Sequence, residues 1–542
     1  MRHIVIRQSL MVASAAMLLL SPDLAAAPLD EAQLEADHVI VGEVRLVKNN
    51  VFDTSNPQEN NILYRLVNRL HMITKDSTIR RQLLFKSGEI YSKRLVDESE
   101  RILRGNTYFY DVSIKPVDRR DGVVDLLVST SDVWTLKPGL SISRKGGQNK
   151  TTVNIEDLNL FGRGQIFRIA RSDDVDRVSK SVEFHDPHLG DSWLSARLLY
   201  SDNSDGNSSM LSLARPFYAL DTRWSAGFTF FNDERRTALY QLGEQAAEFH
   251  RERSYFSAFR GWSAGLHNGW VRRYSAGVVF DEFEFSNVID GTLPAAIPQD
   301  RKLNYAFFGI EILEDHYETT TNRDQIQKTE DFLTGTQVKA TLGWSDRGFG
   351  SDRDAILYSA SASRLFGDLT SSSLLLSGKT SGRIESGSTA NALMRADARY
   401  YLQQSEKRLF FTTISAARGH KLDLDSPLEL GGDTGLRGYP LRYQSGDSSL
   451  LLTVEQRYFW DWYPFRLFRV GAAVFADIGR VWGDDPLGDS NLGWLRDVGF
   501  GLRFASTRTG SRKIIHLDIA FPIDGDDTID NVQILLQSKK RF

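Results

Sequence analysis

From Trp134 to the carboxyl terminus, apolar and polar residues alternate with a period of two, which is typical of β-strands. In residues 337–344, QVKATLGW, the even positions are apolar and most odd positions are polar. Residues 394–400, MRADARY, and 515–521, IHLDIAF, repeat the pattern. No helical period interrupts this alternation, so the part of the chain after Trp134 is predicted to be all-β.

Two architectures fit so many amphipathic strands: a sandwich of two sheets and a closed barrel. The polar face carries charged residues in mid-strand, such as Arg395, Asp397 and Asp518, and prolines are few. A transmembrane barrel explains this pattern because its apolar face meets lipid while its charged face lines a wet lumen. The sequence therefore favours an all-β transmembrane barrel of antiparallel strands over residues 134–542.

The number of strands follows from length and from direct inspection, and the two counts differ. At roughly 25 residues for each strand with its connection, residues 134–542 supply about sixteen strands. Counting the alternating segments one by one gives a total nearer to about twenty, with ambiguous segments at 245–262 and 303–315. We adopt about sixteen, possibly more, and both totals are even.

A small mixed domain is predicted before the barrel, over residues 36–130. Stretches 39–52 and 63–74 look extended, and helices are expected to start near Asp76 and Ser92, the second ending at Gly105 with Leu103 buried. Two more strands follow, at 110–114 and 124–128. The order from residue 63 onward is strand, helix, helix, strand, strand, which leaves 39–52 as an extra N-terminal strand.

Residues 1–26 resemble a secretory signal peptide. Arg2 and Arg7 precede an apolar run from about residue 10 to 20, and small residues allow cleavage after Ala26. The apolar run is too short to cross a bilayer of ~30 Å as a helix. The mature chain is therefore expected to be exported.

Composition narrows the chemistry further. Lys+Arg 66 against Asp+Glu 70 gives a net charge of −4, which lacks the basic excess of a nucleic-acid binder. The absence of cysteine excludes disulfides, thiolate metal sites and a cysteine nucleophile. H-E-x-x-H does not occur, and the one G-x-S-x-G match, GWSAG at residues 261–265, lies among the alternating strands and not at a strand-to-helix turn. We predict no enzymatic activity, no cofactor, no metal site and no nucleic-acid partner.

A glycine-rich segment, residues 431–440, reads GGDTGLRGYP and lies within a predicted loop, 421–448. Glycines at this density mark backbone that turns tightly or packs closely. Five strands follow the loop, and residues 475–482 read FADIGRVW. The last strand ends on an aromatic residue, Phe542, as a terminal barrel signal does.

These features resemble the BamA/TamA family of outer-membrane assembly and translocation factors, which join POTRA modules to a surface-antigen-type barrel. The loop matches the family core [VL]-R-G-[FY], and 475–482 is similar to the family's F-x-D-x-G-x-V-W strand. The resemblance identifies the mixed domain as a single POTRA-like module. It also implies that the loop folds into the lumen, where Arg437 meets Glu455 and Asp477. The predicted site residues are the loop motif, the loop glycines and the two carboxylates: Leu436, Arg437, Gly438, Tyr439, Gly431, Gly432, Gly435, Glu455 and Asp477.

The resemblance implies an accessory factor that inserts or translocates client proteins through a gated seam in the barrel. The alternative is a protein-secreting or solute-conducting pore that resembles the two-partner secretion translocators. The expected partners are unfolded outer-membrane or secreted clients, the lipid bilayer and a periplasmic protein at the POTRA-like domain. The expected location is the outer membrane, with the N-terminal domain in the periplasm.

The first barrel strand contains residues that weaken strand pairing, namely Pro138, Gly139, Gly146 and Gly147. We therefore expect the seam between this strand and the final strand to be weakly paired. Arg442, just outside the loop motif, is expected to tolerate replacement by alanine.

Overall fold

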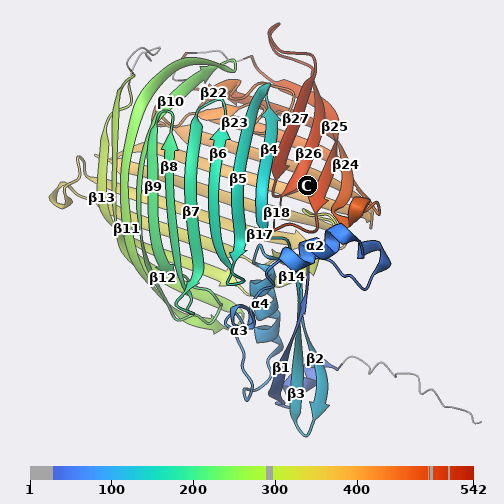
Figure 1. The fold of residues 1–542 in the computed structure, drawn as a ribbon. Helices are drawn as coiled ribbons and strands as arrows, with labels where there is room; N and C mark the ends of the chain where they lie inside the picture. The colour runs from blue at the N-terminus through green and yellow to red at the C-terminus, as the bar shows by residue number, and fades with distance from the viewer. Residues whose placement is uncertain (1–28, 289–296, 486, 489–491, 511–512) are drawn as a thin grey trace, which may run out of the picture.

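The computed structural model describes residues 29–288, 297–485, 487–488, 492–510 and 513–542. The predicted signal peptide, 1–26, lies outside the described residues. In the remainder, a small N-terminal domain sits against one rim of a large closed barrel (Figure 1). None of the described helices is long and apolar enough to span a membrane.

The barrel contains twenty antiparallel strands. In chain order they are β4 (Leu136–Lys145), β5 (Gln148–Leu160), β6 (Gln165–Asp173), β7 (Val178–Leu189), β8 (Leu194–Asn203), β9 (Gly206–Arg215), β10 (Trp224–Gln241), β11 (Glu244–His267), β12 (Trp270–Asn287), β13 (Arg301–Glu314), β16 (Gln337–Ser345), β17 (Ala355–Gly367), β18 (Ser372–Glu385), β19 (Ser388–Ser405), β20 (Arg408–His420), β23 (Ser448–Trp460), β24 (Phe468–Trp482), β25 (Leu495–Ser506), β26 (Ile514–Pro522) and β27 (Gln533–Lys539).

The prediction of about sixteen strands was therefore too low, and the reason lies in the turns. Several hairpins use two-residue turns whose residues both have positive φ, as at Gly146–Gly147 and Leu242–Gly243. Such turns match the twist of the flanking strands, and because they use only two residues they leave more of the chain for strands. Gly146 and Gly147 thus form the β4–β5 turn and do not lie in the strand, whereas Pro138 and Gly139 do.

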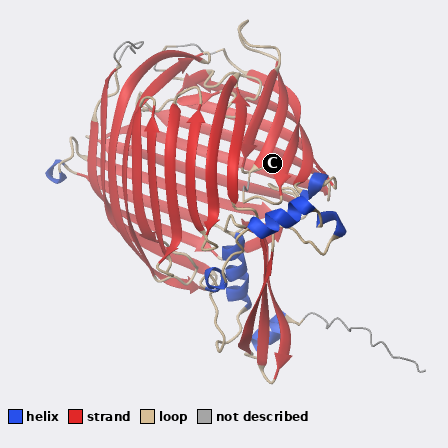
Figure 2. Ribbon diagram, in the orientation of Figure 1, coloured by secondary structure: helices blue, strands red, loops and turns tan. Residues whose placement is uncertain are grey.

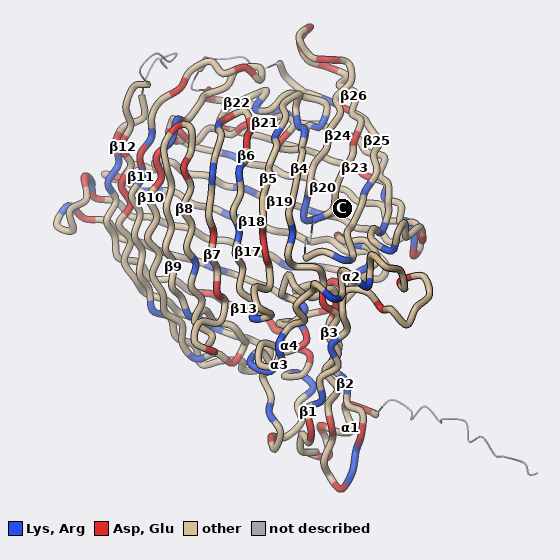
Figure 3. Tube along the Cα trace, viewed as in Figure 1, with Lys and Arg blue, Asp and Glu red and all other residues tan. Residues whose placement is uncertain are grey.

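The two faces of the barrel wall differ as the alternation predicts. Outward side chains are apolar and exposed, for example Ile142 on β4, Ile155 on β5 and Phe500 on β25. Inward positions carry charges joined in ion pairs, such as Arg253 with Asp281. Charged residues recur on many strands of the wall (Figure 3). An apolar belt therefore surrounds a polar lumen, as a barrel embedded in lipid requires.

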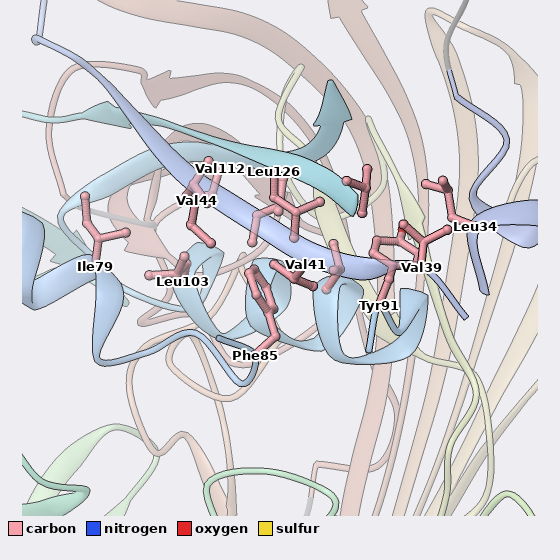
Figure 4. Close-up of a cluster of buried hydrophobic side chains, with 14 of the residues drawn as sticks. Leu34, Val39, Val41, Val44, Ile79, Phe85, Tyr91, Leu103, Val112 and Leu126 are labelled. Carbon is pink, nitrogen blue, oxygen red and sulfur yellow. The ribbon is translucent and has the colours of Figure 1, made fainter. Parts of the chain in front are cut away.

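Helices are concentrated in the N-terminal domain (Figure 2). Its elements are α1 (Glu31–Ala36), β1 (Ile40–Asn49), η1 (Pro57–Glu59), α2 (Ile62–Leu70), α3 (Asp76–Arg80), α4 (Lys93–Arg104), β2 (Phe109–Arg120) and β3 (Val123–Asp132). The sheet has the order β1-β3-β2, with β1 parallel to β3 and β2 antiparallel to it. Leu103, Leu126 and Phe85 contribute to the buried core between sheet and helices (Figure 4).

One expectation for this domain needs correction and another was wrong. The strand predicted within 39–52 is present as β1, but it is not extra, because it is an edge strand of the domain's own sheet. The segment 63–74, expected to be extended, contains helix α2. The Asn61 side chain accepts a hydrogen bond from the Tyr64 amide and caps this helix. Its apolar residues recur at 62, 66 and 70, a helical spacing that the strand interpretation overlooked.

The remaining elements lie in connections between barrel strands. They are β14 (Tyr317–Thr320), β15 (Glu330–Leu333), β21 (Leu428–Leu430), β22 (Gln444–Gly446), η2 (Arg347–Phe349) and η3 (Pro464–Arg466). The hairpin of β14 and β15 joins β13 to β16 at the rim next to the N-terminal domain, and we call residues 315–336 the rim hairpin. The hairpin of β21 and β22 belongs to the lumen loop, 421–448.

Candidate functional site

Arg437 is the centre of a buried cluster between the lumen loop and the barrel wall. Its Nε and Nη2 donate to both carboxylate oxygens of Asp477 on β24, at 2.7 and 2.9 Å. Its Nη1 donates to Glu455 on β23 at 2.8 Å. All three side chains are buried, so these charge-assisted bonds compensate for lost hydration. The contacts that the resemblance implied are present.

The loop glycines allow the backbone to approach the wall closely. A Cβ at position 438 would lie 2.7 Å from the Cβ of Asp497, which is closer than packed atoms tolerate. The Gly438 amide instead donates to Asp497 Oδ2 at 3.0 Å. Gly435 has φ +131, a conformation that residues with a side chain rarely adopt. Both positions therefore help to bring Arg437 to its partners.

The other residues of the motif build an apolar anchor beside the ion pairs. Leu436 and Tyr439 are fully buried and pack in a cluster with Tyr443, Val481 and Leu495. The Tyr439 hydroxyl donates to the backbone carbonyl of Arg496 at 2.7 Å. Gly431 and Gly432 lie at the base of the same loop, where the Gly432 amide donates to the Pro440 carbonyl at 2.8 Å. The loop is thus held by packing as well as by charge.

Sequence reasoning missed several residues of this site. Asp497 was not predicted, although its place on the polar face of a strand near the loop was a usable signal. Arg457 was also missed: its Nε donates to Glu455 Oε2 at 2.8 Å, so Glu455 lies between two arginines. The ring of Phe475 lies 3.4 Å from the Arg437 guanidinium carbon and adds a cation–π contact.

A second set of ion pairs holds the opposite limb of the loop. Asp423 accepts two hydrogen bonds from Arg383 on β18, both at 2.9 Å. Asp425 accepts two from Arg301 on β13, both at 3.0 Å. The loop is therefore tied to strands on widely separated parts of the wall and lies across the lumen.

Arg442, which is expected to tolerate replacement by alanine, makes specific side-chain contacts in the structure. Its guanidinium donates two hydrogen bonds to Asp176 in the β6–β7 turn, at 2.8 and 2.7 Å. It also lies over the ring of Tyr240 at 4.4 Å. The tertiary fold brings Asp176 to Arg442 from 266 residues away, which no local pattern reveals.

The seam between β27 and β4 is weakly paired, in agreement with the expectation. These strands share a single registered residue pair, Leu536 with Arg144. The neighbouring strands β26 and β27, by contrast, pair continuously from Ile514–Lys539 to Ala520–Gln533. Few backbone hydrogen bonds therefore have to break for the barrel to open at this position.

Phe542 closes the chain next to this seam and is buried. Its amide donates to the carbonyl of Asp324 in the rim hairpin at 2.8 Å. Its ring meets Phe459 edge to face, with centroids 5.0 Å apart. The Tyr401 hydroxyl and the Arg541 guanidinium also reach Asp324, at 3.1 and 3.2 Å. The chain end is thus fastened to the rim hairpin.

The rim hairpin also contacts the N-terminal domain. Arg104 on α4 donates to both oxygens of Asp331, at 2.9 and 2.6 Å. The Tyr110 hydroxyl donates to the Gln327 carbonyl at 3.1 Å. One segment therefore links helix α4, strand β2 and the carboxyl terminus beside the seam.

Burial changes the proton affinity of acids in the connections. Burial, reinforced by the charge of Asp324, raises the pKa of Glu330 in the rim hairpin to about 7. Burial also raises the pKa of Glu429 in the lumen loop to about 7. Both carboxyl groups therefore hold their protons more tightly than exposed acids do.

The described residues enclose polar cavities inside the barrel, two of which are lined by charged side chains. One of about 600 Å³ lies between α4 and the wall, lined by Arg101, Tyr274 and Glu311 among others. The second, of about 460 Å³, is lined by Arg253, Arg383 and other charged residues.

Only one group of side chains among the described residues has spacing that could suit a metal ion. It consists of Glu234, His250 and Glu252, whose potential ligand atoms lie within 4.8 Å of one another. These side chains are partly exposed, and exposed acids often gather without an ion.

Residues 68–130 match the family model for POTRA, described as surface antigen variable number repeat. The chain carries a POTRA domain. A POTRA domain ahead of a large closed antiparallel barrel is the architecture that the resemblance to the BamA/TamA family implied. A sequence search of curated proteins found no match.

Solved structures with a similar fold include two CdiB proteins and a BamA. CdiB from Acinetobacter baumannii has a TM-score of 0.45 and 13% identity, over 92% of this chain and 74% of that chain. CdiB from Escherichia coli has a TM-score of 0.44 and 13% identity, over 92% of this chain and 76% of that chain. BamA from Haemophilus ducreyi lacking POTRA domains 1–3 has a TM-score of 0.37 and 14% identity, over 91% of this chain and 84% of that chain.

Proposed function

We propose that this protein is an accessory assembly factor of the bacterial outer membrane. It inserts or translocates client proteins through the β4–β27 seam, with its POTRA domain in the periplasm. The observation that carries this proposal is the single residue pair at the seam beside a lumen loop that is tied down by buried ion pairs. An unpaired strand edge is costly in lipid, so an opened seam offers its backbone groups to a client strand.

The proposed action needs no nucleotide, cofactor or metal, and it is not enzymatic. Hydrogen bonds between seam strands are exchanged for hydrogen bonds to the client, until the client closes on itself. The POTRA domain supplies a second edge: β1 lies at the border of its sheet, and beyond Val41, whose amide and carbonyl already bond to Glu89 and Gly88, this edge can accept an extended client or periplasmic partner strand. The proposed partners are therefore unfolded outer-membrane or secreted proteins, the bilayer and a periplasmic protein.

A pore that secretes proteins or conducts solutes is the second candidate. The two charged cavities within the barrel favour it, because a conducting path needs polar space along the lumen. The lumen loop and the rim hairpin both lie in this path, and conduction would require at least one of them to move.

A liposome assay distinguishes the two functions. The full-length protein is reconstituted into vesicles, and the folding of an unfolded barrel client is followed beside ion conductance. The first proposal predicts faster client folding with little conductance. Conductance without faster folding would reject it in favour of the pore. A client-free sample and empty vesicles provide the controls for each readout.

A further inference from the structure

Helix α2 leaves a continuous apolar surface exposed at the rim of the barrel. Its exposed apolar residues range from 48% to 79% accessible and are followed by the similarly exposed Met72. At 100° per residue they fall within an arc of about 100° on one side of the helix. These residues are Ile62, Leu63, Leu66 and Leu70.

The opposite side of α2 faces the protein. Tyr64 is buried, stacks on Phe52 with ring centroids 4.0 Å apart, and donates a hydrogen bond to the Phe465 carbonyl. Val67 packs into the same cluster with Trp134 and Leu467. The helix therefore has a fixed orientation, and its apolar arc is not a consequence of a loosely attached segment.

The charged residues of α2 lie on a third side of the helix, apart from the apolar arc and from the side that faces the protein. Arg65 and Arg69 are exposed and one turn apart, and α2 contains no acidic residue. An apolar arc flanked by arginines is the pattern of helices that lie in a membrane interface, where the cations meet lipid phosphates.

The surroundings of α2 continue the lipid-facing surface of the barrel. Phe465, which accepts the Tyr64 hydrogen bond, is itself exposed, as are Trp460 and Trp462 before it. Tryptophans at this level of a barrel typically mark the boundary between lipid tails and headgroups. Figure 1 shows α2 running along the rim below β4 and β24–β27.

We propose that α2 is a membrane-interface helix that inserts its apolar arc into the periplasmic leaflet next to the seam. The ligand is a phospholipid surface, and Arg65 and Arg69 bind its phosphates. The helix is joined to the base of β4, because Trp134 packs in the α2 cluster and its amide donates to the Arg508 carbonyl at 2.8 Å. Arg508 in turn donates to Val51 ahead of α2 at 2.6 Å. Docking thus holds one edge of the seam at the level of the headgroups.

This inference rests on the membrane location given under the proposed function, and one experiment separates the two. Because the chain has no cysteine, single-cysteine variants Leu63→Cys and Leu66→Cys accept an environment-sensitive fluorophore at one site each. The full-length protein is reconstituted in phosphatidylethanolamine and phosphatidylglycerol vesicles that carry spin-labelled acyl chains. Ile142→Cys, on the outer face of β4, reports the barrel, and Ile90→Cys, equally exposed on the POTRA domain, reports water.

We expect lipid quenching at positions 63 and 66 to approach that at 142 and to exceed that at 90 several-fold. Quenching at 142 with none at 63 and 66 would overturn the inference and leave the proposed function intact. A blue shift at 66 without lipid quenching would mean that a protein covers the helix, which also overturns it. Absence of quenching at 142 would reject the membrane location and both proposals together.

The arginines are tested by a second variant. Quenching at position 66 is expected to be stronger in vesicles containing phosphatidylglycerol than in phosphatidylcholine alone, because the former are anionic. The pair Arg65→Gln and Arg69→Gln should remove this difference while leaving quenching at 142 unchanged. Equal dependence on lipid charge with and without the arginines would overturn their assigned role.

Discussion

The seam and the opposite wall of the barrel are built from the same kind of strand but differ greatly in pairing. β10 and β11 pair along their length from Trp224–Trp262 to Gln241–Glu244. On the lumen face of β11 and β12, Arg253 forms a bidentate ion pair with Asp281 at 2.8 and 3.0 Å. β4 and β27 share one residue pair. Stability is therefore distributed unevenly around the barrel, and opening is inexpensive only at one position.

The supports beneath the two sides also differ. Below the wall opposite the seam, Glu98 on α4 accepts a hydrogen bond from the Leu220 amide at 2.8 Å. Below the seam side, α2 packs against the turn around Phe465. The rim hairpin connects α4 with the carboxyl terminus beside the seam, since it contacts both Arg104 and Phe542. This arrangement gives the POTRA domain a physical connection to the seam.

The largest effect is expected from locking the seam. A disulfide between Leu536→Cys and Arg144→Cys joins the only registered pair, whose antiparallel spacing suits a disulfide. The oxidised protein should retain its fold and lose client insertion, measured in the liposome assay. The matched control joins Ala258→Cys and Val278→Cys, a registered pair of the strong wall, and should remain active. Full activity of the locked seam would contradict the gating mechanism.

The next effect concerns the lumen loop. Arg437→Ala leaves Glu455 and Asp477 buried near each other without their shared cation, which should cost about 3–5 kcal/mol if water stays out. We expect loss of heat resistance, measured by heat-modifiable gel mobility and by denaturant unfolding. Arg347→Ala, at an exposed arginine of η2, should change neither readout.

The charge argument can be separated from packing by a double variant. Adding Asp477→Asn to Arg437→Ala removes the carboxylate that has lost its arginine, whereas Glu455 keeps its ion pair with Arg457, so part of the lost stability should be recovered. If the double variant is as unstable as the single variant, the cation–π and packing contacts of Arg437 dominate over its ion pair with Asp477.

A smaller effect is expected in the POTRA domain. Leu103 is completely buried in the core of α4, so Leu103→Ala should destabilise this domain by about 2–5 kcal/mol. Hydrogen exchange of residues 36–130 measures the change, and Ile90→Ala, at an exposed site, serves as control. The heat resistance of the barrel should be nearly unaffected. Equal loss in both parts would mean that they unfold as one unit.

The smallest effect is a pH dependence of the rim hairpin. Because burial raises the pKa of Glu330 to about 7, the folded hairpin favours the protonated acid. Its contribution to stability is complete below the unfolded pKa near 4.5 and is lost as pH rises through about 7, amounting to at most ~3 kcal/mol. Hydrogen exchange of residues 317–333 should therefore be faster at pH 8 than at pH 6 after correction for intrinsic rates. Glu330→Gln should abolish the difference.

Local patterns in the sequence were sufficient for the two-domain plan and for the centre of the site. Alternation identifies which face of each strand meets the lumen, so Glu455 and Asp477 are placed correctly once the loop motif is recognised. The strand number was underestimated because it was calculated from an average length for each strand with its connection. Several hairpins here have two-residue turns and use fewer residues than that average. Helix α2 was missed because its apolar residues, over so short a segment, fit both the helical period of about 3.6 residues and the strand period of two.

What the sequence determined by itself is the chemistry of each surface: an apolar belt, a charged lumen and a glycine-rich loop that carries the arginine of the family motif. These properties are local, since each depends on residues a few positions apart. Only the tertiary structure decided which distant groups meet, such as Arg442 with Asp176, Arg104 with Asp331 and Phe542 with Asp324. The physical reason is that long-range pairing depends on strand register and barrel closure, which sum over the whole chain and are encoded in no single segment.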